Sequence, residues 1–402
     1  MNSLKIKTLS IATIALILLT VVTLVGIAIP AQAETDTLLY QFTGGPDGSA
    51  PYSGLLLKGT SLYGTTASGG NASAYGVVYA VNINTGKETI LHTFGGQANN
   101  DGSLPYGALA FYKAGYYGTT LGGGKYNNGT IYKLVKKGKI YVETVLHSFS
   151  CTDGCNPEYV TLVFDKLGNL YGTTFNGGTY GNGTVFKLAS DGTLTTLHSF
   201  NAGAGDGYSP VSGVALDKKG NLYGVTPIGG SHAAGTIYEI TATGVYSTLY
   251  NFTGGADGWV PRSALVLDKK GNLYGTTQDG GAGCTWGCGV LYKFSPTTGV
   301  ETVLHTFSGV PDGEYPMYGA LVFDKLGNIY GTTEAGGAFP GGSNVGTMYK
   351  LAPDGTETIL CNFDVKEGTV PLGSVALDKL GNLFTTASGG GLNFGTVIKV
   401  TP

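Results

Sequence analysis

The stretch Asp165-Lys166-Leu167-Gly168-Asn169-Leu170-Tyr171-Gly172-Thr173-Thr174 decides the fold of this chain, because copies of it recur throughout the sequence. Two degenerate copies precede it and end in Gly-Thr-Thr at 64–66 and 118–120. Four closer copies follow at 217–226, 268–277, 324–333 and 378–386, the last of them one residue shorter. The aromatic residue of the copies recurs every 51 to 56 residues, so the chain consists of seven tandem repeats.

Each repeat contains four short segments with strand character. In the third repeat these are 144–149, 160–165, 169–174 and 183–188, where apolar and polar residues alternate and β-branched and aromatic residues are frequent. Asp-Lys-x-Gly-Asn predicts a tight hairpin closed by a left-handed glycine. An Asp-Gly-x-x-Pro element also recurs seven times, with Glu367 replacing Asp in the last copy, and its proline predicts a strand entrance.

Seven units of four antiparallel strands predict an all-β fold, a seven-bladed β-propeller. The second segment of each repeat is rich in small residues and is expected to be the innermost strand, which makes the first segment of the following repeat the outermost. The chain after residue 34 begins with a segment of the first type, 38–42, and ends with one of the fourth type, 395–400. We therefore expect the N-terminal segment to be the outermost strand of the last blade, which closes the ring and covers a sheet edge. In this order the long loops share one face, the loop face, and the short hairpins share the other, the hairpin face. An open solenoid would need polar caps, and neither end departs from the repeat.

Residues 1–33 are typical of a targeting segment. Lys5 and Lys7 precede an apolar run from Leu9 to Ile29, and Ala31-Gln32-Ala33 matches a cleavage site. The sequence thus predicts a signal peptide, 1–33, and a single propeller domain, 34–402. An uncleaved N-terminal anchor is the alternative, and it is the one membrane contact that we expect. The cleaved signal peptide and the uncleaved anchor both predict an extracellular or cell-surface protein.

The cysteines fit an oxidising compartment. Cys151 and Cys155 bracket one short loop, and Cys284 and Cys288 bracket another, so we expect two local disulfides. Both pairs have C-x3-C spacing, whereas structural zinc sites favour C-x2-C. Cys361 is left over and is expected to be a buried thiol.

Charge excludes one class of partner. The formal net charge is -3, and removal of Lys5 and Lys7 with the signal peptide would make it -5. The chain has a single arginine, Arg262, whereas nucleic-acid binding requires a basic surface. We expect no nucleic-acid partner and a monomeric protein.

The units Leu-Tyr-Gly-Thr-Thr-x-x-Gly-Gly, Gly-Thr-Val-Phe-Lys-Leu and Leu-His-Ser-Phe resemble the bacterial GloVer repeat of "choice-of-anchor tandem repeat" extracellular proteins. The resemblance covers residues 38–400 and implies secretion or surface display, with no established enzymatic activity. The strand order is also similar to that of NHL-type propeller repeats.

Residue types that often do chemistry fall on equivalent positions of several repeats. One position is shared by His92, His147, His198 and His305. We expect these histidines to pack between blades and the Asp of each Asp-Gly-x-x-Pro to cap its own turn. The sequence predicts no catalytic residue, metal or cofactor. Calcium held by the Asp-Gly loops is an alternative, and so is a propeller enzyme of the lactonase or lyase type.

Residues that differ between repeats are the better binding candidates. On the loop face these are Trp259, Trp286, Tyr208, Tyr315, Arg262 and His232, with Tyr106 and Phe339 as further aromatics. Exposed aromatic side chains beside neutral loops can stack on sugar rings. The sequence therefore predicts a non-enzymatic binding or structural module whose partner is an extracellular glycan, another polymer or a protein. A protein-interaction scaffold without a small ligand is the alternative.

Overall fold

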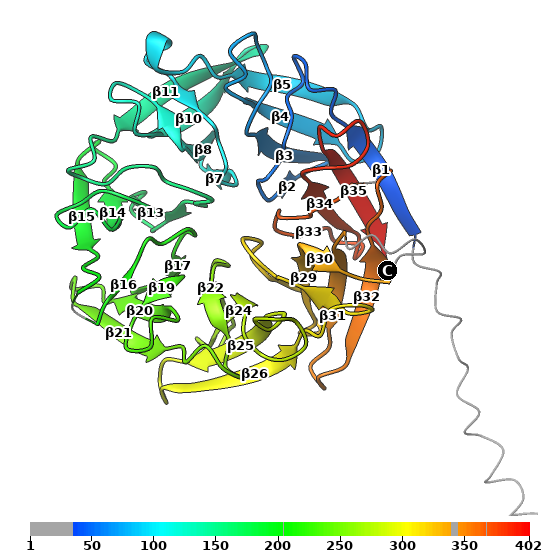
Figure 1. Cartoon of the computed structure of the whole chain (residues 1–402). Helices are drawn as coiled ribbons and strands as arrows, with labels where there is room; N and C mark the ends of the chain where they lie inside the picture. The colour runs from blue at the N-terminus through cyan, green and yellow to red at the C-terminus, as the bar shows by residue number, and fades with distance from the viewer. Residues whose placement is uncertain (1–34, 204, 339–344, 367) are drawn as a thin grey trace, which may run out of the picture. The chain divides into compact units, whose positions relative to one another are not determined.

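The computed structural model describes residues 35–402 except 204, 339–344 and 367. The expected signal peptide, Phe339 and Glu367 lie outside the described residues. Within them, six four-stranded antiparallel sheets and one of five strands form a ring, which confirms the seven-bladed propeller (Figure 1). The described residues contain one short 3-10 helix, η1 (Gln97–Asn99), and no helix with the length and apolarity that crossing a bilayer requires.

The strands of each blade follow the chain from the innermost outward. Blades 1 to 3 contain β2 (Leu56–Lys58), β3 (Ser61–Thr66), β4 (Val77–Asn82) and β5 (Glu88–Thr93); β7 (Ala110–Tyr112), β8 (Gly115–Thr120), β10 (Thr130–Lys137) and β11 (Ile140–Ser148); and β12 (Val163–Phe164), β13 (Leu170–Thr174), β14 (Thr184–Leu188) and β15 (Leu194–Ser199). Blades 4 to 6 contain β17 (Ala215–Leu216), β18 (Leu222–Thr226), β20 (Thr236–Ile240) and β21 (Tyr246–Asn251); β23 (Val266–Leu267), β24 (Leu273–Asp279), β25 (Val290–Ser295) and β26 (Val300–Thr306); and β28 (Val322–Phe323), β29 (Ile329–Thr333), β31 (Thr347–Leu351) and β32 (Glu357–Asn362). Blade 5 has an extra strand, β22 (Trp259–Pro261), and short pairs in the loops join β6 (Gly102–Ser103) to β9 (Gly122–Gly123), β16 (Gly207–Tyr208) to β19 (Ile228–Gly229), and β27 (Gly313–Glu314) to β30 (Ala335–Gly336).

Blade 7 closes the ring as expected. Its inner strands are β33 (Ala376–Leu377), β34 (Leu383–Ala387) and β35 (Thr396–Thr401), and its outermost strand is the N-terminal β1 (Thr35–Gln41). The blue β1 lies beside the red β35 in Figure 1. Leu38 pairs with Ile398, and the N–H of Phe42 donates to the carbonyl of Gly395 at 3.0 Å. The two ends of the ring are thereby joined in one sheet.

The repeated Asp builds the inner hairpin. Asp165 Oδ1 accepts from the N–H groups of Leu167 and Asn169 at 2.9 Å. Its other oxygen accepts from the Asn169 side chain at 2.6 Å and the Tyr171 hydroxyl at 3.0 Å. Gly168 has φ 88°, which confirms the left-handed glycine. Because one carboxylate satisfies four donors, aspartate is strongly favoured at this turn.

The glycine of Gly-Thr-Thr leaves room for an aromatic ring from the next strand. In blade 6 a Cβ added at Gly331 would lie 2.4 Å from the hydroxyl oxygen of Tyr349, its cross-strand neighbour. In blade 7 the equivalent pair is Thr385 and Ile398, so glycine and aromatic are lost together. This register also corrects the expectation that the last copy is one residue short. It has full length, with Thr385 in place of glycine and Ala387 in place of the final threonine.

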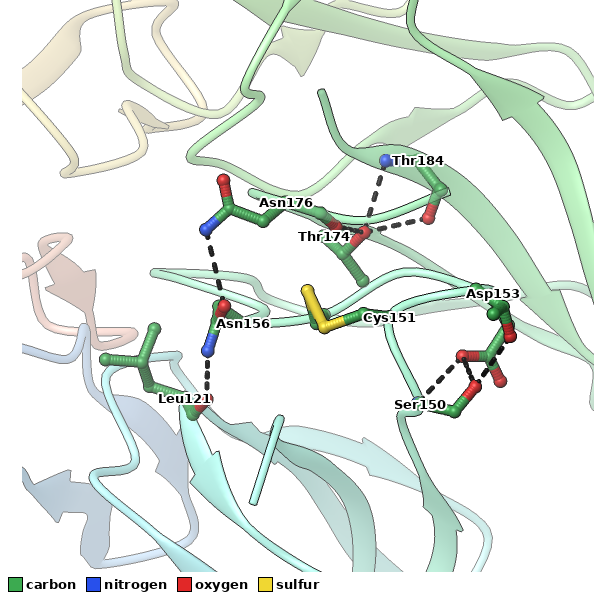
Figure 2. The surroundings of a disulfide bond; sticks show 10 residues. Leu121, Ser150, Cys151, Asp153, Asn156, Thr174, Asn176 and Thr184 are labelled. Carbon is green, nitrogen blue, oxygen red and sulfur yellow. Dashed lines mark hydrogen bonds between the residues drawn. A yellow bond between two sulfur atoms is a disulfide. The ribbon is translucent and has the colours of Figure 1, made fainter. Parts of the chain in front are cut away.

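The threonines of the same element join strands and blades. Thr173 Oγ1 donates to the Ser212 carbonyl of the next blade at 2.7 Å, and Thr386 does the same to Ser53 at 2.9 Å across the closure. The following threonine pairs within its blade, as Thr174 does with Thr184 at 2.8 Å (Figure 2). These bonds confirm that Gly-Thr-Thr serves the fold.

The residue before each repeat proline links neighbouring blades. All seven of these residues have a left-handed φ of 54 to 60°, although none is glycine: Ala50, Leu104, Asn156, Ser209, Val260, Tyr315 and Val370. The Leu104 N–H donates to the carbonyl of Tyr75 in the preceding blade at 3.0 Å. In blade 3 the Asn156 side chain also bonds to Leu121 and Asn176, beside a disulfide (Figure 2). This linkage fixes the chain just before it reaches the propeller axis.

Candidate binding site at the loop-face mouth of the channel

The residues after the repeat prolines line the propeller axis. Six blades together surround a small, partly open cavity of about 20 Å³. The residues that line it are Tyr52, Ser53, Gly54, Tyr106, Ala108, Tyr159, Thr161, Ala264, Tyr318, Ala320, Leu372 and Ser374. Small residues dominate where the inner strands begin, and tyrosines lie nearer the loop face. We call the loop-face end of this channel the mouth.

Four tyrosines from blades 1, 2, 3 and 6 meet at the mouth. The ring centroids of Tyr52 and Tyr106 are 5.3 Å apart with planes 24° from parallel. Tyr106 and Tyr159 are also 5.3 Å apart, and Tyr159 stacks on Tyr318 at 4.0 Å. All four side chains are only partly buried. Aromatic faces from distant parts of the chain therefore form one continuous, partly exposed cluster.

Two of these tyrosines are one-residue insertions into the repeat. Five positions separate Pro51 from Leu56, the first residue of its inner strand, and the same spacing holds in blades 2, 4, 5 and 7. In blades 3 and 6 the spacing is six. The extra residue is accommodated at Tyr159 (φ 47°) and Tyr318 (φ 57°). A left-handed tyrosine costs about 1–2 kcal/mol, and such strain concentrates at functional sites.

Arg262 contributes the positive charge at the mouth. It follows the proline of blade 5, and its Nη1 donates to the Tyr318 hydroxyl. Its guanidinium carbon lies 5.5 Å from the centroid of the Tyr318 ring, a cation–π distance. The Arg262 Nε is buried and has no hydrogen-bond acceptor among the described residues. The guanidinium thus keeps one buried N–H group without a partner among these residues.

Three half-buried carboxyl groups interact electrostatically with Arg262. Burial raises the pKa values of Glu158, Asp279 and Glu334, and the charge of Arg262 lowers each of them in part. Burial also raises the pKa of Tyr159 and of Tyr318. Flat aromatic faces beside carboxyl, guanidinium and hydroxyl groups suit an uncharged polyhydroxylated ligand, since rings can stack and polar groups can bond to its hydroxyls.

The structure distributes the residues named from sequence over several places. Arg262 lies at the mouth, as above. Trp259 and Trp286 form an edge-to-face pair with centroids 6.0 Å apart, and Trp286 is 67% exposed. Tyr315 is half-buried, and burial, followed by Glu314, Asp279 and Glu334, raises its pKa.

Two other candidates lie elsewhere. Tyr208 packs against the core cluster between blades 3 and 4, which contains Val185 and Phe200. His232 is exposed, and its Nδ1 lies 3.0 Å from the Ser231 hydroxyl. Neither is among the residues that line the mouth cavity.

The sequence interpretation missed Tyr52, Tyr159 and Tyr318. The available signal was a length difference: Pro157 and Pro316 are each followed by one more residue before the inner strand than their counterparts. Counting that spacing would have marked both tyrosines as specific to their repeats.

The repeat histidines bond to the repeat aspartates at the periphery of the ring. Nε2 of His92, His147, His198 and His305 lies 2.8 to 3.2 Å from the Asp of the following Asp-Gly turn. Tyr40 and Tyr250 replace histidine and donate to Asp47 and Asp257 at 3.1 and 3.0 Å. Each of these aspartates also caps its turn, as Asp47 does by accepting from the Thr43 N–H at 2.8 Å. The two structural roles expected from sequence are thus one network.

A glutamate of the next blade adds a second carboxyl to several of these pairs. The ligand atoms of His92, Asp101 and Glu143 lie within 4.8 Å of one another, as do those of His305, Asp312 and Glu357. Such sets could hold a divalent cation. Burial, and then Asp101, raises the pKa of Glu143 to about 7. Burial and the neighbouring aspartates similarly raise the pKa values of Glu88 and Glu301 to about 7.

These raised pKa values predict a loss of stability at alkaline pH. A carboxyl that binds its proton more tightly when folded stabilises the fold below its unfolded pKa of about 4.3. That contribution is lost as the pH rises through the folded value of about 7. We expect the urea midpoint to fall between pH 5.5 and 8.5. The variant Glu88→Gln/Glu143→Gln/Glu301→Gln should flatten this fall, and an equally steep fall in the variant would contradict the assignment.

Both expected cysteine pairs form disulfides. The Cα atoms of Cys151 and Cys155 are 4.6 Å apart, and those of Cys284 and Cys288 are 5.1 Å apart. The Cys151 bridge lies in the Asp-Gly turn of blade 3 (Figure 2). Cys361 is buried outside the disulfides, and its Sγ lies 3.7 Å from an Asp36 carboxylate oxygen.

Several solved structures are similar in fold. One is a crystallised extracellular domain from B. thetaiotaomicron, assigned to a one-component system, with 11% identity and TM-score 0.56 over 91% of this chain and 40% of that one. A puromycin hydrolase variant has 12% identity and TM-score 0.59 over 90% and 54%. The GH74 enzyme of Niastella koreensis has 16% identity and TM-score 0.56 over 84% and 51%. This chain thus spans about half or less of each.

Sequence comparison gives a family. No curated protein matches the chain. The model of the Gloeobacter/Verrucomicrobia repeat matches residues 25–163 and 115–342, more than half of the chain. With its seven-bladed repeat architecture, the chain belongs to the Gloeobacter/Verrucomicrobia repeat family.

Proposed function

We propose that this protein is an exported, non-enzymatic binding module that holds a neutral glycan or similar polyhydroxylated polymer at the mouth. The observation that carries the proposal is the pair of inserted, left-handed tyrosines. Tyr159 and Tyr318 interrupt a spacing kept by the other five repeats, and they stack on each other beside Arg262. The other five repeats close the ring without the extra residue, so closure alone does not require it.

The surroundings favour a sugar over other ligands. Tyrosine faces provide apolar area at low conformational cost. Arg262 offers its guanidinium group beside Tyr318, and Glu158 and Glu334 offer oxygens whose charge is partly suppressed by burial. The exposed Trp286 with Trp259, three residues before Arg262, would extend the surface along a longer chain of sugars.

Export is supported by independent features. Residues 1–33 have the pattern of a signal peptide, and two disulfides suit an oxidising compartment. The similar structures include an extracellular domain and two enzymes, but at 11% to 16% identity their likeness shows the fold alone.

Replacing the inserted tyrosines should weaken binding while leaving the ring folded. The variant Tyr159→Gly/Tyr318→Gly removes both aromatic faces and suits the left-handed backbone. Loss of two stacked rings predicts about a tenfold or larger increase in Kd, measured by calorimetry with the strongest glycan from an array. The melting temperature should change by only a few degrees.

The matched control is Tyr180→Ala, which removes a 55% exposed loop-face tyrosine away from the mouth. It should bind like the unmodified protein. Unchanged affinity in the double glycine variant would refute the mouth as the site. Absence of glycan binding together with stoichiometric capture of one protein would instead support the scaffold alternative.

A further inference from the structure

The hairpin face carries a ring of lysines around the axis. The seven inner hairpins contain nine exposed lysines: Lys58, Lys113, Lys166, Lys218, Lys219, Lys269, Lys270, Lys325 and Lys379. Five of these hairpins also contain an aspartate, but each such carboxylate accepts hydrogen bonds within its own turn, as Asp324 does from Leu326, Asn328 and Tyr330. The seven inner hairpins together therefore have four more lysines than aspartates, nine against five.

Large aliphatic side chains lie at the tips of the same hairpins. Leu167, Leu326 and Leu380 follow the lysines of blades 3, 6 and 7 and are 78%, 81% and 89% exposed. The outer hairpins of this face add the exposed Ile140, Val245 and Val300. Single exposed leucines are common on protein surfaces, but a contiguous apolar patch rimmed by charged side chains marks an interaction site.

A groove of about 1110 Å³ joins the hairpins of blades 5, 6 and 7. Its walls combine four lysines and two exposed leucines with three aspartates, each of which accepts hydrogen bonds within its own turn: Lys269, Lys270, Lys325, Lys379, Leu326, Leu380, Asp268, Asp324 and Asp378. Aromatic side chains of the inner strands form part of the lining. Cationic and apolar groups are thus interleaved over one continuous surface.

The loop face has the opposite character. Among the described residues its connections carry the aspartates of six Asp-Gly turns and the acids of the mouth, with only Lys125 and Lys366 as lysines. The charge asymmetry between the two faces gives the ring an electrostatic orientation. A negatively charged planar surface would attract the hairpin face and repel the loop face.

We propose that the hairpin face docks on an anionic lipid bilayer. Lysines near an anionic headgroup layer gain electrostatic energy, and aliphatic tips gain by entering the headgroup–acyl boundary. A soluble polyanion would attract the lysines but would offer the leucines no apolar phase. β1 begins on this face as well, since Thr35 pairs with Thr401 at the hairpin end of the sheet. Docking would leave the mouth turned away from the membrane.

Vesicle co-sedimentation tests this docking. The ring closes within residues 35–402, so the protein used is 34–402, which lacks the apolar N-terminal run. Vesicles of phosphatidylcholine with phosphatidylglycerol should bind it, and pure phosphatidylcholine should bind at least tenfold less. Added salt screens the lysine charges, so binding should fall by about tenfold or more between 50 and 500 mM salt.

Matched variants separate the two faces. Lys325→Glu/Lys379→Glu should lower the partition coefficient by about tenfold or more, whereas Lys125→Glu/Lys366→Glu makes the same charge change on the loop face and should alter it less than twofold. Leu326→Ser/Leu380→Ser should lower it severalfold, unlike Val365→Ser/Leu392→Ser on the loop face. All substitutions are at exposed positions, and unchanged melting temperatures would confirm that the ring is intact.

Three outcomes would overturn the proposal. The first is equal binding to neutral and anionic vesicles. The second is equal loss in the loop-face controls, or no loss on removing the leucines. The third is retention by polyphosphate in the absence of any vesicle binding, which would assign the lysine ring to a soluble polyanion.

Discussion

Removal of residues 34–42 is expected to abolish cooperative folding of the ring. These residues include β1, whose pairing with β35 spans Thr35 to Gln41, and Phe42, which is 0% exposed. Truncating one buried phenylalanine to alanine costs about 3–5 kcal/mol, and the total stability of a folded protein is about 5–15 kcal/mol. Loss of the whole strand also exposes the edge of β35. The remaining stability should be close to zero.

The measurement is urea unfolding followed by fluorescence and circular dichroism. Phe42→Ala should retain a single transition at a lower midpoint, because the strand remains. A synthetic peptide of residues 34–42 added to the truncated chain should restore the transition, since closure uses only non-covalent pairing. A truncated chain that unfolds at the midpoint of the full protein would disprove the closure.

Substitution of Gly331 by alanine is expected to destabilise the protein by about 1–3 kcal/mol, the usual cost of overpacking a core. The backbone at Gly331 does not have a positive φ, so conformational strain does not enter. The cost comes from space: the new Cβ would lie 2.4 Å from the Tyr349 hydroxyl oxygen and 2.7 Å from its ring. Tyr349 is buried and its hydroxyl has no hydrogen-bond partner among the described residues, so the ring has little room to move.

Blade 7 indicates a second substitution that should relieve the clash at Gly331→Ala. Blade 7 holds Thr385 and Ile398 at the equivalent positions, so Gly331→Ala should cost much less in a Tyr349→Ile background. Gly203→Ala is the control, because the added Cβ meets nothing closer than 3.6 Å there. Equal costs at positions 331 and 203 in thermal or urea unfolding would show that the glycine is not a packing requirement.

The repeat explains why so much of the fold could be predicted. A single copy of Asp-Lys-Leu-Gly-Asn would be a weak hairpin signal, but its recurrence at a spacing of 51 to 56 residues fixes the number and size of the blades. The Asp165 turn and the pairing of β1 with β35 both follow from local sequence and strand order alone. Neither requires knowledge of which side chains meet across the ring.

The peripheral network was predictable only in part. Repeat position alone indicates that His92 packs at a blade boundary and that Asp101 caps its turn. Their hydrogen bond depends on how the Asp-Gly turn folds back over the outer strand, and Glu143 comes from another blade altogether. Local pattern carries no information about that neighbour.

The mouth was the least predictable part. Tyr159 and Tyr318 are far apart in sequence, and ring closure brings them to 4.0 Å. Trp259 and Trp286 were chosen as rare exposed aromatics, and they do pair, but on the loop of a single blade. Among the candidates named from sequence, Arg262 connects the tryptophan pair to the mouth, because it directly follows the strand that begins at Trp259.

The most direct test of glycan binding at the mouth is a crystal structure of residues 34–402 with the glycan that binds most strongly in the array. We expect sugar electron density at the mouth, with a pyranose ring against Tyr159 or Tyr318 and a hydroxyl within hydrogen-bond distance of Arg262. Density confined to the hairpin face or to the blade periphery, with the mouth occupied by water alone, would contradict it.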